Sequence, residues 1–65
     1  MNTDQIIRSR ARFKKGDSVY FEGLTWKIFS IGYSPQDDKL FFMLERHDHS
    51  QPRQVLAKEL EDVYF

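Results

Sequence analysis

The sequence of 65 residues contains no cysteine, and this absence excludes disulfide bonds and zinc sites built on thiolates. No apolar run approaches the roughly 20 residues that a membrane-spanning helix needs. The first residues lack the basic and apolar segments of a secretory signal, so we expect a cytoplasmic protein. A chain of this length has room for one domain, and it would suit a bacterial or phage accessory protein.

The chain also lacks net charge, because ten Lys and Arg residues balance ten Asp and Glu residues. A net-neutral protein attracts phosphate only weakly. The charges are unevenly distributed: residues 1–27 carry six basic and three acidic side chains, and residues 28–65 carry four basic and seven acidic ones. The two halves could neutralise each other in the fold or form a functional dipole.

Aromatic residues make up 15% of the chain, a share that is too high for a disordered segment. Short apolar runs between turn residues predict five strands. These are Ser18–Phe21, Leu24–Ile31, Leu40–Arg46, Gln54–Ala57 and Glu61–Phe65. Glu22-Gly23 predicts a tight hairpin, Gly32 predicts a bulge or bend, and Lys58–Leu60 predicts a single helical turn.

Residues 1–12 are predicted to form a basic N-terminal arm or a short helix ahead of the domain of residues 13–65. Asn2 or Thr3 could cap a helix that has Asp4 in its first turn. Residues 7–13 instead alternate between apolar or small side chains and arginines, as an extended arm or edge strand would. We expect a helical start to about Ile7, followed by an extended segment.

Three segments resemble SH3-like barrels of the Tudor and KOW kind: Phe13–Val19, Trp26–Ile28 with Ile31, and Val55–Val63. The resemblance covers about residues 13–65, and it implies an all-β fold, a small five-stranded barrel with a helical turn before the last strand. Its motifs are generic, since Gly-Asp makes a turn and Val enters the core, so they imply a fold and no function.

A second resemblance implies an enzymatic hypothesis. Gln54-Val55-Leu56 falls near the position at which the plasmid-borne type II dihydrofolate reductases place Gln-Ile-Tyr. That family also builds an SH3-like barrel and assembles as tetramers around a shared pore. Leu56 replaces the tyrosine and the rest of the signature is missing, so the similarity is one of layout.

The sequence does not place the residues that catalysis requires in the patterns of an active site built from a single chain. Glu45, His47 and His49 could offer three ligands to zinc or nickel, but this segment also suits a solvated loop. Asp37 and Asp38 lie in a turn, where Asp typically bonds the backbone. No cysteine nucleophile, glycine-flanked serine or phosphate-cradling loop is present. We therefore expect no catalytic residues, no metal, no other cofactor and no small-molecule substrate.

The basic candidate site consists of Arg8, Arg10, Arg12, Lys14 and Lys15. Alternating arginines on an extended arm could follow the phosphates of a nucleic acid. The same side chains could instead solubilise an edge strand or pair with the acidic half of the chain. Nucleic-acid binding by this arm is therefore the alternative hypothesis for function.

The apolar residues of the central strands divide into two sets. Val19, Phe21, Trp26, Ile28, Phe42 and Leu44 can fill one small core. A second set then points the other way: Phe29, Ile31, Tyr33, Phe41 and Met43. This second set is covered either by Ile6, Ile7 and Phe13 or by a partner, since apolar patches mark interfaces. We predict a non-catalytic interaction module that self-associates or docks on a protein through this face.

Overall fold

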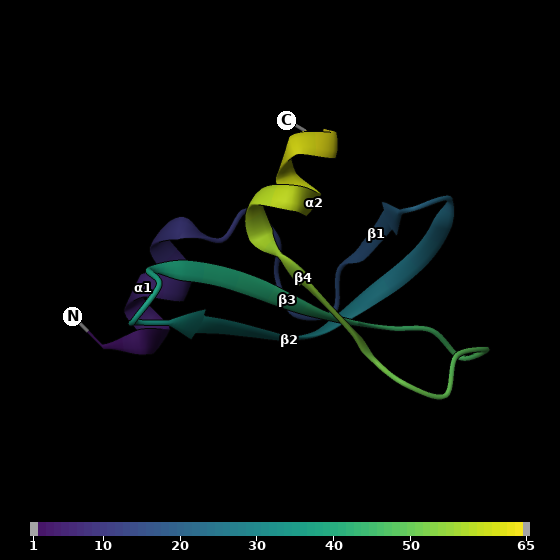
Figure 1. Ribbon diagram of the computed structural model, residues 1–65, viewed down its shortest axis with the longest axis horizontal. Helices are drawn as coiled ribbons and strands as arrows, with labels where there is room; N and C mark the ends of the chain where they lie inside the picture. Colours follow the sequence, from purple (N-terminus) through teal and green to yellow (C-terminus); the bar gives the residue numbers. More distant parts are fainter. Residues whose placement is uncertain (1, 65) are drawn as a thin grey trace.

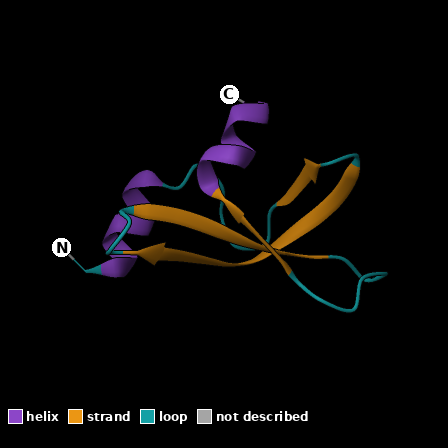
Figure 2. Ribbon diagram, viewed as in Figure 1, coloured by secondary structure: helices purple, strands orange, loops and turns teal. Residues whose placement is uncertain are grey.

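The computed structural model describes residues 2–64 and shows an open four-stranded antiparallel sheet with two short helices (Figures 1 and 2). The strands pair in the sequence order β1-β2-β3-β4. The elements are α1 (Thr3–Arg10), β1 (Ser18–Phe21), β2 (Leu24–Ser34), β3 (Lys39–Glu45), β4 (Arg53–Leu56) and α2 (Ala57–Tyr64). Within residues 2–64, no helix has the length and apolarity that a membrane crossing requires.

The predicted hairpin between β1 and β2 is confirmed. Phe21 pairs with Leu24, and Glu22 and Gly23 form the two-residue connection. Both connecting residues have positive φ, at 52° and 81°. Two successive positive φ values match the right-handed twist of the flanking strands, which is why such turns favour glycine.

The β2–β3 pair contains a bulge at Phe29, where the register shifts between Ile28 and Ser30. Ile28 pairs with Leu44 and Ser30 pairs with Met43, so Phe29 has no partner in the ladder. A single extra residue reverses the alternation of every side chain that follows it. The prediction of an irregularity in this strand is confirmed, but its position at Gly32 is wrong.

The predicted core is confirmed, because all six of its residues are buried. Val55 of β4 and Ala57 and Leu60 of α2 complete it. Phe13, ahead of β1, packs the edge of its ring against Phe42 with centroids 5.8 Å apart. We call the sheet surface that carries this core the inner face, and the opposite surface the outer face.

The predicted five-stranded barrel is wrong, and so is the fold that the SH3-like resemblance implied. Residues 61–64 of the segment expected to form the last strand belong instead to α2, which runs from Ala57 to Tyr64 (Figure 1), and Phe65 lies outside the described residues. Ala57 and Leu60 recur at helical spacing and are both buried. The helix places its apolar side on the inner face, where a fifth strand would have closed the sheet. The edges β1 and β4 therefore do not meet.

The N-terminal segment is helical over Thr3–Arg10, which confirms the helix alternative and corrects the extended segment expected after Ile7. Asn2 caps the helix: its side chain accepts from the Gln5 N–H, and the Gln5 side chain accepts from the Asn2 N–H. Such reciprocal capping satisfies two backbone donors at the helix start. The cap explains why this segment does not follow its period-two pattern.

Candidate interaction surfaces

The bulge at Phe29 separates the five residues of the predicted apolar interface. Beyond the bulge, Ile31 pairs with buried Phe42, and Tyr33 pairs with Leu40. Ile31 and Leu40 pack against the core, so this part of β2 presents Ile31 and Tyr33 to the inner face. The expectation that all five side chains share one face is therefore wrong.

The N-terminal segment covers the inner-face members of the set. Ile31 lines a groove together with Ile7 and Ala11 of the α1 region, as well as Phe13. The Arg10 guanidinium lies 5.9 Å from the centre of the Tyr33 ring. Cover by the first residues of the chain, the alternative considered from the sequence, thus applies to Ile31 and Tyr33.

Of the predicted interface, Phe41 and Met43 lie on the outer face, and Leu56, which was not in the predicted set, lies there with them. Phe41 pairs with Gly32 on one side and with Leu56 on the other, and Met43 lies across from Gln54. The Phe41 ring rests over Gly32, because a Cβ built at Gly32 would lie 2.2 Å from the tip of that ring. We call Phe41, Met43 and Leu56 the outer patch. Sequence analysis missed Leu56, although its alternation with buried Val55 marks it.

Phe29 is half-buried at the bulge itself, and it is the one member of the predicted interface that the ladder leaves unpaired. Phe41 and Met43 are also half-buried, and the Leu56 residue is 37% exposed. A half-buried apolar cluster retains area that a partner can remove from water.

Arg10, Tyr33 and Asp38 tie the end of α1 to the turn between β2 and β3. The Tyr33 hydroxyl and Arg10 Nη1 both donate to Asp38 Oδ1, at 2.5 Å and 2.6 Å. These bonds, first that from Tyr33 and then that from Arg10, lower the pKa of Asp38. Asp38 has φ of 51°, a left-handed conformation that Asp tolerates in turns. The cluster fixes α1 and removes Arg10 from the basic candidate site.

The other basic candidates gather at a groove between α1 and β2. Arg8, Arg12, Lys14 and Lys15 line this groove, and Arg10 does not. Arg8 and Arg10 diverge because a helix turns about 200° over two residues, whereas a strand would have kept them on one side. The structure therefore brings together four of the five predicted basic residues.

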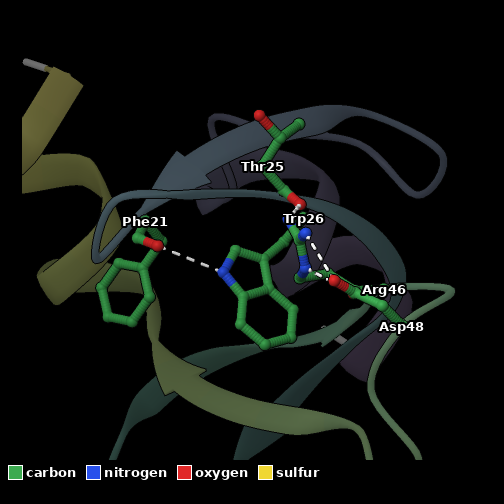
Figure 3. A network of polar contacts seen from close by, with 5 residues as sticks. All are labelled: Phe21, Thr25, Trp26, Arg46 and Asp48. Atoms are coloured by element: carbon green, nitrogen blue, oxygen red, sulfur yellow. Dashed lines mark hydrogen bonds and ion pairs between the residues drawn. The ribbon is translucent and has the colours of Figure 1, made fainter.

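A polar network closes the opposite end of the core around Trp26 (Figure 3). The indole N–H donates to the Phe21 carbonyl, and the Arg46 guanidinium lies 5.7 Å from the centre of the Trp26 ring. Arg46 also donates to the Thr25 carbonyl and to both Asp48 carboxylate oxygens. These bonds from Arg46 lower the pKa of Asp48 to about 2.

The same network accounts for part of the histidine segment. The His49 ring lies 5.0 Å from the Trp26 ring, and Asp48 is engaged by Arg46. Within residues 2–64, no three His, Asp or Glu side chains gather as metal ligands would. Asp37 accepts a hydrogen bond from the Ser34 hydroxyl, as a turn residue does.

Comparison with protein-family models, with curated proteins and with solved structures gives no match for this chain. The functional argument therefore rests on two surfaces: the outer patch and the basic groove between α1 and β2.

Proposed function

We propose that this protein is a small interaction module that pairs with a second copy of itself by stacking the outer faces of the two sheets. The observation that supports this proposal is the outer patch. Phe41, Met43 and Leu56 lie on the sheet surface opposite the core, and the contacts of α1 and α2 are with the inner face. Apolar side chains on such a surface favour a partner that removes them from water.

The charges on β3 favour a second copy as that partner. The outer-face residues of β3 read Lys39, Phe41, Met43 and Glu45, with opposite charges at the two ends. Within residues 2–64, neither Lys39 nor Glu45 forms an ion pair. In a two-fold dimer whose axis lies in the interface and crosses β3 at a right angle, the strand meets its copy in the reverse direction. Lys39 of each copy would then face Glu45 of the other, with the apolar residues between them.

The dimensions of the strand permit this arrangement. Lys39 and Glu45 lie about 20 Å apart along β3, because a strand rises about 3.4 Å per residue. Stacked sheets lie about 10 Å apart and cross at about 30°, so the charged ends stay within reach of a lysine side chain. A three-residue patch is small compared with stable interfaces of about 800 Å² per partner. We therefore expect a dimer that dissociates in the micromolar to millimolar range.

Sedimentation equilibrium of charge-exchanged variants tests the proposal. Lys39→Glu and Glu45→Lys each place like charges opposite one another in a two-fold dimer, so each variant alone should sediment as a monomer. An equimolar mixture should recover a heterodimer, since every Glu then faces a Lys. The double variant should recover the homodimer for the same reason. A wild-type monomer at the highest soluble concentration would refute the proposal, as would a mixture that stays monomeric.

A matched pair of apolar variants locates the interface. Leu56→Asp should abolish the dimer, because a carboxylate would be buried without a partner. Val63→Asp is the control: Val63 is 63% exposed on α2, away from the outer patch, and its replacement should leave the dimer intact. Equal effects of the two changes would remove the outer patch from the interface.

Nucleic-acid binding by an extended basic arm requires a geometry that differs from the one observed. The arm is helical, and Arg10 is paired with Asp38. The remaining basic residues line a groove, whose ligand is considered next.

A further inference from the structure

The groove between α1 and β2 combines an apolar floor with a basic rim. Ile7, Ala11, Phe13 and Ile31 provide apolar surface, and Arg8, Arg12, Lys14 and Lys15 provide positive charge. Among the described residues, Asp4, in the first turn of α1, is the one carboxylate that lines it. Apolar and cationic side chains in one groove favour a ligand that carries both aliphatic groups and negative charge.

Three of the cations are available to a ligand. Within residues 2–64, the ion pairs involve Arg10, Arg46 and Arg53, and none involves Arg8, Lys14 or Lys15. A local turn also fixes the backbone of the two lysines. The Lys14 N–H donates to the Asp17 carboxylate, the Asp17 N–H donates to the Lys14 carbonyl, and Gly16 has φ of 97°. A rigid turn reduces the entropy lost when its side chains bind.

The β2 wall of the groove is an open strand edge. The Ile28 N–H donates to the Asp17 carbonyl, and the Ile28 carbonyl accepts from the Gly16 N–H. Both bonds lie on the side of β2 away from β3. Within residues 2–64, no backbone bond reaches this edge beyond Ile28. Strand alternation, with the one extra residue at Phe29, places the backbone groups of Ile31 and Tyr33 on the same edge. An open edge offers hydrogen bonds to an added strand.

We propose that this groove binds an extended acidic segment of a partner protein, added as a strand along β2 at Ile31 and Tyr33. Aliphatic side chains of the segment would contact Ile7, Ala11 and Ile31, and its carboxylates would face Arg8, Lys14 and Lys15. The partner is therefore a peptide that alternates acidic and aliphatic residues.

The groove fits a peptide better than a nucleic acid. Binding of single strands typically uses an aromatic surface on which bases stack. Phe13, the aromatic residue that lines the groove, packs its ring against Phe42 and Tyr64, with centroids 5.8 Å and 5.3 Å away. The chain also has no net charge, whereas nucleic-acid-binding domains are typically basic.

Fluorescence anisotropy with defined probes tests the proposal on the full chain. The probe is a labelled peptide of about ten residues that alternates Glu and Val, the length of a long strand. The matched peptides alternate Gln and Val or Lys and Val, and a thymidine oligonucleotide and a uridine oligonucleotide provide the nucleic-acid arms. We expect the Glu peptide to bind at least about ten-fold more tightly than the Gln peptide, with an affinity that falls as salt rises.

Variants of the basic rim assign the binding to the groove. Lys14→Gln with Lys15→Gln should weaken the Glu peptide about five- to twenty-fold, given the small energies of exposed ion pairs. Lys58→Gln removes an exposed cation of α2 that does not line this groove, and it should change the affinity less than about two-fold. Far-ultraviolet circular dichroism of each variant separates lost binding from lost folding.

Hydrogen exchange tests the strand addition itself. The bound peptide should slow exchange of the Ile31 and Tyr33 amides, and a purely electrostatic contact would not. The proposal is overturned if the Glu peptide does not bind, if binding ignores the two lysines, or if both amides stay unprotected. Tighter binding of either oligonucleotide, with the same dependence on Lys14 and Lys15, would assign the groove to nucleic acid instead.

Discussion

The two faces of the β2–β3 pair carry similar apolar residues but differ in how far these residues are buried. On the inner face, Ile28, Phe42 and Leu44 are fully buried beneath α2 and the segment that follows α1. On the outer face, Phe41 and Met43 are only half-buried, and the Phe41 ring rests over Gly32 of the sheet itself. The difference teaches that hydrophobicity alone does not mark a core. Its cause is the position of the helices, which both contact one face.

The sharpest contrast is between two neighbours on β3. Replacement of Phe42, which is 0% exposed, by Ala should lower the free energy of unfolding by about 3–5 kcal/mol. Phe41→Ala should cost clearly less, about 1–2 kcal/mol, because its ring is partly solvated already. Urea unfolding of both variants measures the difference.

If Phe42→Ala unfolds the chain outright, Ile28→Val provides a milder probe of the same face, with an expected loss of about 0.5–1.5 kcal/mol. Equal losses at Phe41 and Phe42 would show that the outer face is as well covered as the inner one.

The second prediction concerns Gly32, on which the Phe41 ring rests. Gly32→Ala should destabilise the protein by about 1 kcal/mol, because the new Cβ must displace the Phe41 ring. In a Phe41→Ala background the same change should instead stabilise by about 0.5 kcal/mol, since Gly is unfavourable within a strand. The reversal of sign in a double-mutant cycle is the measurement. The same sign in both backgrounds would contradict the contact.

The core could be predicted from the sequence because, in regular strands that flank a turn, every second side chain points to the same face of the sheet. Val19 and Phe21 alternate on β1, and Phe42 and Leu44 alternate on β3, and all four are buried. The bulge could not be placed, since one extra residue at Phe29 has no characteristic sequence. Its effect was large, because it transferred Ile31 and Tyr33 from the predicted interface to the inner face.

The helices illustrate how a strong local pattern can be overruled. Arg8, Arg10 and Arg12 alternate as in a strand, yet the Asn2–Gln5 cap starts a helix that includes two of them. The capping residues are visible in the sequence, and a helix predicted from them through Arg10 places Arg8 and Arg10 on different sides. At the other end, Lys58–Leu60 predicted a helical turn. Leu60 and Ala57 drive its extension, because both enter the core.

The third prediction addresses the link that holds α2 over the inner face. The Tyr20 N–H of the edge strand β1 donates to the Tyr64 hydroxyl of α2. Tyr64→Phe removes the acceptor and keeps the ring that packs against Phe13. We expect a loss of about 0.5–1 kcal/mol and faster hydrogen exchange at the Tyr20 amide. Val63→Ala is the matched control and should change stability by less than about 0.5 kcal/mol.

The smallest expected effect is the pH dependence of the Trp26 network, where the inner face meets solvent. Arg46 holds the pKa of Asp48 at about 2, below the ordinary value of 3.8. A carboxylate whose pKa is lower in the folded state stabilises the fold above the ordinary value. That contribution should disappear as the pH falls from about 4 to about 2. Carboxyl carbon chemical shifts, followed by NMR, should give a midpoint near 2 for Asp48.

Replacement of Arg46 tests the cause of that midpoint. Arg46→Met removes the charge and both hydrogen bonds, so Asp48 should titrate near 3.8, its ordinary value. Arg46→Lys keeps the charge and loses the two-pronged geometry, so it should give an intermediate midpoint. Because the Asp48 side chain is half-exposed, added salt should also raise the midpoint in the wild type. A midpoint that stays near 2 in Arg46→Met would show that a group other than Arg46 lowers the pKa of Asp48.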